Sequence, residues 1–221
     1  MITTRKLVQS WKLKLLFSRI KMDRKYRLSF TAASLRLLEM SEMAKLYLEE
    51  GAENITKGAI IRGRNSRTTD REFRELKFRV EKLTKRQLEI LATGDVLAQK
   101  QIALLAICKL YAFIRDFVVE VLREKSLAFN YQITEGEYTS FFRRKSEIHQ
   151  ELENLTESTA KKIKQVTFKI LEQTGLIDNI ESRSINPQIV EEKVVRAVVE
   201  DDPEWLKIYL LSDMEVANRT S

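Results

Sequence analysis

Arginines and hydroxyl residues gather at the start of one segment, in a combination suited to binding phosphates. The stretch GRNSRTTDREFR supplies the first candidate nucleic-acid-binding residues, which are Arg64, Ser66, Arg67, Thr68, Thr69, Arg71 and Arg74. Guanidinium groups bind phosphates or guanine edges through paired hydrogen bonds. Hydroxyls and free N–H groups at a helix start add donors beside the positive end of the macrodipole. The pattern therefore predicts a contact with nucleic acid.

A second basic stretch, TESTAKKIKQVTFKI, repeats this arrangement. Aligning Thr69 with Thr159 pairs apolar and basic residues of the two stretches in the same register. In each stretch the apolar stripe falls on one side of a helix with about 3.6 residues per turn, and most basic residues fall outside it. The second set of candidates is Ser158, Thr159, Lys161, Lys162 and Lys164. Phe78 and Phe168 correspond in this alignment but lie off the stripe, so we expect them to pack these helices against neighbouring elements.

The composition predicts an all-α fold. The 221 residues include only six glycines and two prolines, too few for a β-sandwich with many tight turns. Hydrophobic residues at 43% and charged residues at 32% suit a folded, helix-rich protein. The net charge of +7 is concentrated before Arg27 and between Lys57 and Arg86, as expected of a polyanion binder. A solvated basic surface without a ligand is the alternative interpretation.

Helical periodicity and capping residues divide the chain into successive helices. We expect helices over residues 34–50, 69–83, 84–93, 95–125, 135–150 and 158–174, with a short helix at NITKGAII and one last helix starting at Pro187. Thr69 with Glu72, and Thr84 with Gln87, have the spacing of capping boxes. Asp95 and either Thr156 or Ser158 are expected N-caps, and Gly51, Gly94 and Gly175 are expected helix ends. The apolar helix 95–125 is predicted to lie at the centre of the core.

The order of these helices suggests two helix-turn-helix-like units joined by the long central helix. The predicted parts are a basic N-terminal extension (1–22), a first unit (23–94), a central core helix and loop (95–133), a second unit (134–211) and a polar tail (212–221). In such units the second helix puts its N-terminal residues into the major groove. The segment LIDNIESRSINPQIV has the residues of a short β-hairpin, which would make the second unit winged and place Arg183 and Ser184 at its tip.

Residues 1–22 differ in composition from the rest of the chain. They could be a basic arm that lies on nucleic acid or on an acidic membrane surface, an ordinary first helix, or the product of a start codon placed before Met22.

Signals for catalysis are few, and we expect no enzyme, metal or cofactor. His149 is the single histidine, so a Cys/His metal site or a histidine-based triad lacks residues, and we expect this side chain to be exposed. Phosphate-binding glycine motifs are absent. Glu191, Glu192 and Lys193 resemble part of a nuclease motif with Asp178, but no apolar strands surround them. The lone Cys108 suits a core position in a reducing cytoplasm.

The apolar stretch 102–122 contains four charged residues, which argues against a membrane span and for a buried helix.

Several stretches agree in order and spacing with one known family. They are YRLSFTAASL, SRTTDREFRELKFRVEKLT, LLAICKLYAFIRDFVVEVLREK and LTESTAKKIKQVTFKILEQTGLI, within residues 26–211. In these stretches the chain resembles the BrxA family, a small component of the BREX (bacteriophage exclusion) defence systems of bacteria. The resemblance implies a non-enzymatic, cytoplasmic role beside a methyltransferase and ATPase partners. It also implies similarity to a helical antitermination factor of the NusB type, which would favour RNA.

We therefore expect a double-stranded DNA-binding accessory protein whose two basic helices give two footholds on one duplex. Two alternatives stay open. One is RNA binding in the antitermination style, and the other is a protein scaffold for the methyltransferase or ATPase. The oligomeric state and the DNA sequence preference do not follow from the sequence.

Overall fold

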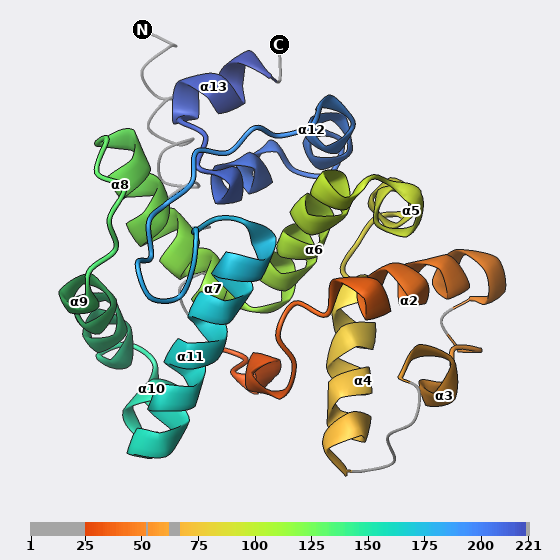
Figure 1. Ribbon diagram of the computed structural model, residues 1–221, viewed down its shortest axis with the longest axis horizontal. Helices are drawn as coiled ribbons and strands as arrows, with labels where there is room; N and C mark the ends of the chain where they lie inside the picture. Colours follow the sequence, from red (N-terminus) through yellow and green to blue (C-terminus); the bar gives the residue numbers. More distant parts are fainter. Residues whose placement is uncertain (1–24, 52, 62–66, 220–221) are drawn as a thin grey trace, which may run out of the picture.

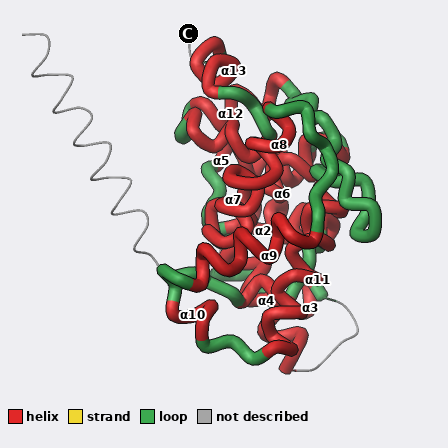
Figure 2. The backbone as a smooth tube through the Cα atoms, turned by 90° about the vertical axis from the view of Figure 1, so that its left-hand side faces the viewer, coloured by secondary structure: helices red, strands yellow, loops and turns green. Residues whose placement is uncertain are grey.

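Helices form all of the regular secondary structure in the described part of the chain. The structure, a computed structural model, describes residues 25–51, 53–61 and 67–219 (Figure 1). Its α-helices are α2 Leu37–Glu50, α3 Lys57–Ile60, α4 Arg67–Val80, α5 Lys85–Thr93, α6 Val96–Leu110, α7 Ala112–Phe117, α8 Glu124–Leu127, α9 Glu135–Ser146, α10 Gln150–Glu153, α11 Glu157–Thr174, α12 Glu192–Val199 and α13 Asp213–Asn218. The 3₁₀ helices η1 Ser29–Ala32 and η3 Pro203–Tyr209 and the π-helix η2 Val118–Arg123 add to these. The all-α prediction is confirmed, and Figure 2 shows no strand in these residues.

Helix α6 lies at the centre of the fold (Figure 1). The Asp95 carboxylate caps it by accepting hydrogen bonds from the N–H groups of Leu97 and Ala98, each at 3.0 Å. All side chains of residues 101–108 are buried, including Cys108, as predicted. Helices α4, α5, α11 and α12 pack against α6, and α2 packs across α4 and α5.

The predicted continuous helix over residues 95–125 is wrong, because the helix breaks at Tyr111. The backbone there is extended, with φ −115° and ψ 90°, and α7 starts at the next residue. The Tyr111 ring is fully buried, and its hydroxyl donates to Glu75 at 2.8 Å and accepts from Arg79 Nε at 3.2 Å. No glycine or proline marks the break. Tertiary contacts of one side chain decide it, so periodicity gives no signal.

Several predicted helix ends are confirmed. Thr84 and Gln87 form the capping box of α5, and Gly94 follows its last residue. Thr156 accepts a hydrogen bond from the N–H of Thr159 at the start of α11. Gly175 ends α11 in the left-handed conformation, with φ 83°.

Other predicted ends are wrong. Helix α4 begins at Arg67 instead of Thr69, so Thr69 lies inside the first turn, and Glu72 pairs with Arg36. The helix predicted over 135–150 ends at Ser146. The last segment becomes helical at Glu192, five residues after Pro187.

His149 is buried and not exposed as predicted. Only 6% of the residue is exposed, because its ring stacks on Tyr26 with centroids 3.7 Å apart. Its Nδ1 lies 3.3 Å from a carboxylate oxygen of Glu151. The histidine therefore helps to hold the segment before η1 against α10.

The predicted hairpin is a bridged loop without strands. Single antiparallel bridges join Ile177 to Ile185 and Gln132 to Ser184. The loop packs against the connection before α9, where Ile133 donates its N–H to the Arg183 carbonyl at 3.2 Å. Arg183 is not at a free tip: its guanidinium lies 4.4 Å from the Phe168 ring centroid and 2.9 Å from Glu135.

Candidate nucleic-acid interface

Helix α4 turns its apolar stripe toward the core and carries a set of buried polar residues beside it. Leu76 and Val80 are fully buried, as the stripe predicts. Glu72, Glu75 and Arg79 are also buried, although charged side chains are rarely buried unless they are paired.

Arg79 is completely buried and is satisfied by the backbone of the segment before α2. Its guanidinium donates to the carbonyls of Ala33 and Ser34, each at 2.6 Å, and of Leu35 at 3.4 Å. Its Nε donates to the Tyr111 hydroxyl at 3.2 Å. These bonds hold α4 against the 33–35 segment and the break at Tyr111.

The Glu75 carboxylate is ionised at the centre of this network. Burial acts to raise its pKa, but hydrogen bonds from Arg27 and Tyr111 outweigh burial and hold the pKa below its ordinary value. Burial raises the pKa of the Tyr111 hydroxyl to about 12, so this group keeps its proton and donates a hydrogen bond to Glu75.

Each of the three acidic residues of α4 is paired with a cation from another element. Lys57 of α3 contacts Asp70 at 2.6 Å, Arg36 contacts Glu72, and Arg27 contacts Glu75 at 2.8 Å. The negative charge of the helix is therefore neutralised by residues outside it. As a result, the exposed arginines of α4, Arg67, Arg71 and Arg74, face solvent without compensation by the acids of their own helix.

Arg67, Arg71 and Arg74 form an exposed stripe along the first half of α4. All three side chains are exposed, and none has an acidic partner within the described residues. Their spacing of four and three residues places them on one face. At about 1.5 Å of rise per residue, the stripe is about 10 Å long. This cationic face is the part of the structure best suited to contact a polyanion.

The remaining candidate residues near α4 are exposed, buried or outside the described residues. Thr68 is exposed beside Arg67 at the helix start. Thr69 is buried, with 2% of the residue exposed, so it does not share the cationic face. Arg64 and Ser66 lie outside the described residues.

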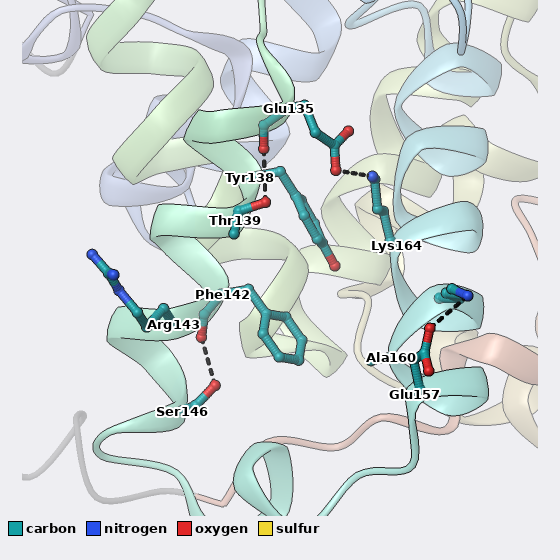
Figure 3. A pocket seen from close by; sticks show the side chains of 10 residues that line it. Glu135, Tyr138, Thr139, Phe142, Arg143, Ser146, Glu157, Ala160 and Lys164 are labelled. Carbon is teal, nitrogen blue, oxygen red and sulfur yellow. Dashed lines mark hydrogen bonds and ion pairs between the residues drawn. The ribbon is translucent and has the colours of Figure 1, made fainter.

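The candidate residues of α11 are exposed or half-buried, but two of its lysines have acidic partners. Ser158 and Thr159 share hydrogen bonds with the capping Thr156 hydroxyl, at 3.1 and 2.8 Å. Lys161 contacts Glu157 at 2.6 Å, and Lys164 contacts Glu135 of α9 (Figure 3). Lys162 contacts only Gln165, at 3.3 Å, within the described part. The second copy therefore carries less uncompensated charge than the first.

The two copies differ at the pair of positions beside the apolar stripe. In α4 the aromatic Phe78 is 38% exposed, with Arg27 over its ring at 4.4 Å, and the next residue, Arg79, is buried. In α11 the aromatic Phe168 is buried against Phe117, and the next residue, Lys169, is exposed. The expected packing role is thus confirmed for Phe168, whereas Phe78 stays near the surface.

A groove between α9 and α11 did not emerge from the sequence. Tyr138 and Phe142 of α9 and Ala160 of α11 form its floor. Lys161 and Arg143 also belong to its lining, and the Arg143 side chain leaves α9 on the side away from α11 (Figure 3). Tyr138 and Phe142 stand four residues apart, so they lie on one helix face. That spacing was the available signal, but it is also the signal of an ordinary core stripe.

Comparison with known proteins assigns this fold to a family. The family model described as BrxA matches residues 24–202, which is most of the chain. The chain belongs to the BrxA family. The resemblance seen in the sequence is therefore confirmed.

One relative and one solved structure illustrate the BrxA match. The BREX protein BrxA of Bacillus cereus (strain H3081.97) is 29% identical over 104 residues, which cover 44% of this chain and 52% of that protein. The chain thus spans about half the length of this curated relative. The crystal structure of an uncharacterized protein from Magnetospirillum magneticum matches with a TM-score of 0.72 and 17% identity, over 85% of this chain and 98% of that chain. At this identity the match supports the fold alone.

The described helices were compared with the length and hydropathy of a membrane-spanning helix. None of them combines the length and the apolar character that crossing a membrane requires.

Proposed function

We propose that this BrxA-family chain is a non-enzymatic component of a BREX defence system and binds double-stranded DNA through α4. The observation that carries the proposal is the exposed stripe of Arg67, Arg71 and Arg74, which lacks acidic partners within the described residues. In this proposal α3 and α4 act as a helix-turn-helix pair, with the N-terminal half of α4 on the duplex.

The chemistry of the stripe supports a duplex as the ligand. Free guanidinium groups bind phosphate oxygens and can reach guanine edges through two parallel hydrogen bonds. The N-terminus of α4 adds the positive end of its macrodipole beside Arg67 and Thr68. The acids of α4 do not oppose this field, because Lys57, Arg36 and Arg27 neutralise them.

Helix α11 is proposed as a second, weaker foothold. Ser158 and Lys162 lie on its outer surface, whereas Lys161 and Lys164 each share their charge with a carboxylate. Two footholds on one duplex would raise the affinity through effective concentration. The structure-based expectation is that α4 contributes more than α11.

The test compares two triple variants in a salt series. Fluorescence anisotropy measures binding of a labelled DNA duplex to the wild type, to R67A/R71A/R74A and to K161A/K162A/K164A. Each lost phosphate contact lowers the slope of log K against log salt by about 0.9. We expect the α4 variant to lose up to about three units of slope and the α11 variant about one. Both variants remove three positive charges, so each controls for net charge.

The same assay separates the alternatives. Stronger binding of single-stranded or structured RNA than of the duplex would replace the proposal with RNA binding. Equal loss in both triple variants would show that net charge, and not the α4 stripe, drives binding. Absence of binding at physiological salt would leave a scaffold for the methyltransferase or ATPase as the better explanation.

A further inference from the structure

The groove between α9 and α11 runs along both helices and is mostly apolar. It has a volume of about 390 Å³ and opens at the surface. Its lining runs along α9 from Glu135 to Ser146, which is about 16 Å at about 1.5 Å of rise per residue. On the α11 side it runs from Glu157 to Lys164. A groove with this shape suits an elongated ligand, such as a helix, better than a small cyclic molecule.

The uncompensated charge among the residues that line the groove is positive. Arg143 is exposed and has no acidic partner within the described ranges. Within the described residues the acidic partner of Lys161 is Glu157, and both side chains are largely exposed, at 76% and 82%, so this pair is weak and easily exchanged. Glu135 is already held by Lys164 and Arg183. An occupant with carboxylates on its flank would therefore meet free or easily freed cations.

The Tyr138 hydroxyl is a buried polar group without a hydrogen-bond partner in the described part of the chain. Only 5% of the residue is exposed, and the side chain projects from α9 toward α11 (Figure 3). Most buried polar groups find a partner, and a missing one is costly. Neighbouring hydroxyls do not supply it, because Thr139 and Ser146 donate to carbonyls of their own helix. The groove thus contains an unused donor next to its apolar floor.

We propose that this groove binds an amphipathic, acidic α-helix of a protein partner. The apolar stripe of that helix packs on Phe142 and Ala160, and a polar side chain accepts from the Tyr138 hydroxyl. Its carboxylates face Lys161 on the α11 side and Arg143 along the outer edge of α9. The small side chain of Ala160 allows the incoming helix a close approach. Recognition of an amphipathic helix in an apolar groove between helices is a common mode of peptide binding.

A nucleic acid strand fits this groove less well. Glu135 and Glu157 belong to its lining and would oppose a run of phosphates. The groove also lies apart from the proposed α4 contact, because Figure 1 shows α9 and α4 separated across the fold, whereas Lys161 and Lys164 belong both to the groove lining and to the weaker α11 foothold. The proposal therefore does not depend on DNA binding by α4.

The test uses a synthetic probe. A fluorescein-labelled helical peptide of about five turns carries a Leu/Ala stripe flanked by Glu. A twin peptide has Lys in place of Glu, and an oligo-dT of similar length serves as the nucleic-acid probe. We expect saturable binding of the acidic peptide to the full chain. The variant R143E should weaken it about tenfold and improve binding of the Lys twin, since reversing a charge across an interface reverses the preference.

Matched variants locate the site. K162E makes the same charge change on the outer face of α11 and should alter peptide binding less than about twofold. A160W fills the groove and should abolish peptide binding while leaving circular dichroism and the part of the duplex affinity contributed by Arg67, Arg71 and Arg74 unchanged. Y138F removes the unused donor, so it should weaken the peptide severalfold without lowering the melting temperature of the free chain.

Three outcomes would overturn the proposal. The first is that the acidic peptide fails to bind saturably. The second is that R143E and K162E act alike, and the third is that oligo-dT binds in an A160W-sensitive manner in place of the peptide. Because the duplex assay is separate, failure here leaves the proposed DNA contact standing, and the reverse also holds.

Discussion

At the scale of single residues, Arg79 and Lys169 show how one register position serves two different purposes. The two residues align between the repeated helices, and both are basic. Arg79 is fully buried and hydrogen-bonds three carbonyls, whereas Lys169 is exposed and contacts Glu172 one turn away. Removing Arg79 would leave those buried carbonyls without this donor, and an unsatisfied buried acceptor lowers stability.

Replacing this pair of residues by methionine gives a direct test. We expect R79M to lower the free energy of unfolding by about 3 kcal/mol or more, because it breaks a buried charged network. The matched change K169M should stay within about 0.5 kcal/mol, since exposed pairs contribute little. Urea denaturation of both variants measures the difference. Equal effects would mean that the buried network is not important for stability.

At the scale of elements, the two copies of the basic helix are the same amphipathic unit in different surroundings. In α4 the residue buried beside the stripe is Arg79, and in α11 it is Phe168. Successive residues point about 100° apart on a helix, so the two copies are rotated relative to their surroundings. This rotation explains why the aromatic residue is near the surface in one copy and in the core in the other.

Replacing either of two glycines in or beside helices with alanine is expected to change the free energy of unfolding, in opposite directions. Gly175 ends α11 with φ +83°, where the Leu176 N–H bonds to the Leu171 carbonyl at 2.9 Å. A side chain is strained in this conformation, so G175A should lower the free energy of unfolding by about 1 kcal/mol. Gly58 lies within α3, and nothing stands within 4 Å of an added Cβ. G58A should therefore raise stability by about 0.5 kcal/mol. Thermal melts of both variants check the two signs.

At the scale of the whole molecule, one hydrophobic cluster extends from Tyr26 to Val216. The C-terminal elements α12 and η3 pack on α5 and α6, far from them in sequence. Gln87 donates to the Ala197 carbonyl at 2.9 Å, and Lys109 contacts Asp201 at 2.6 Å. Both ends of the described chain therefore complete the same core.

A shared core predicts a single cooperative unfolding transition. In a W11F background Trp205 of η3 is the sole tryptophan, so its fluorescence reports on the C-terminal part. Circular dichroism at the helical minimum reports on all helices. We expect the two urea curves to coincide. Separate midpoints would show that the C-terminal elements unfold as an independent unit.

The sequence by itself determined the helical class, the apolar stripes and many helix ends. Few glycines and prolines, 3.6-residue periodicity and local caps at Thr84, Asp95, Thr156 and Gly175 depend on nearby residues, so they can be read directly. The outward direction of Arg71 and Arg74 follows from the same periodicity, whereas Arg67 was expected in the turn before the helix and lies in its first turn.

Only the tertiary structure decided the break at Tyr111, the burial of Arg79 and His149, and the groove between α9 and α11. Each depends on partners distant in the chain, such as Ala33 for Arg79 and Tyr26 for His149. It also decided that Arg67, Arg71 and Arg74 have no acidic partner within the described residues. The acids of their own helix are paired instead with Arg27, Arg36 and Lys57, which come from other parts of the chain. The local sequence pattern sets the helix face on which a residue lies. The free energy of burying a charged side chain depends on the hydrogen-bonding and charged partners that the fold places beside it.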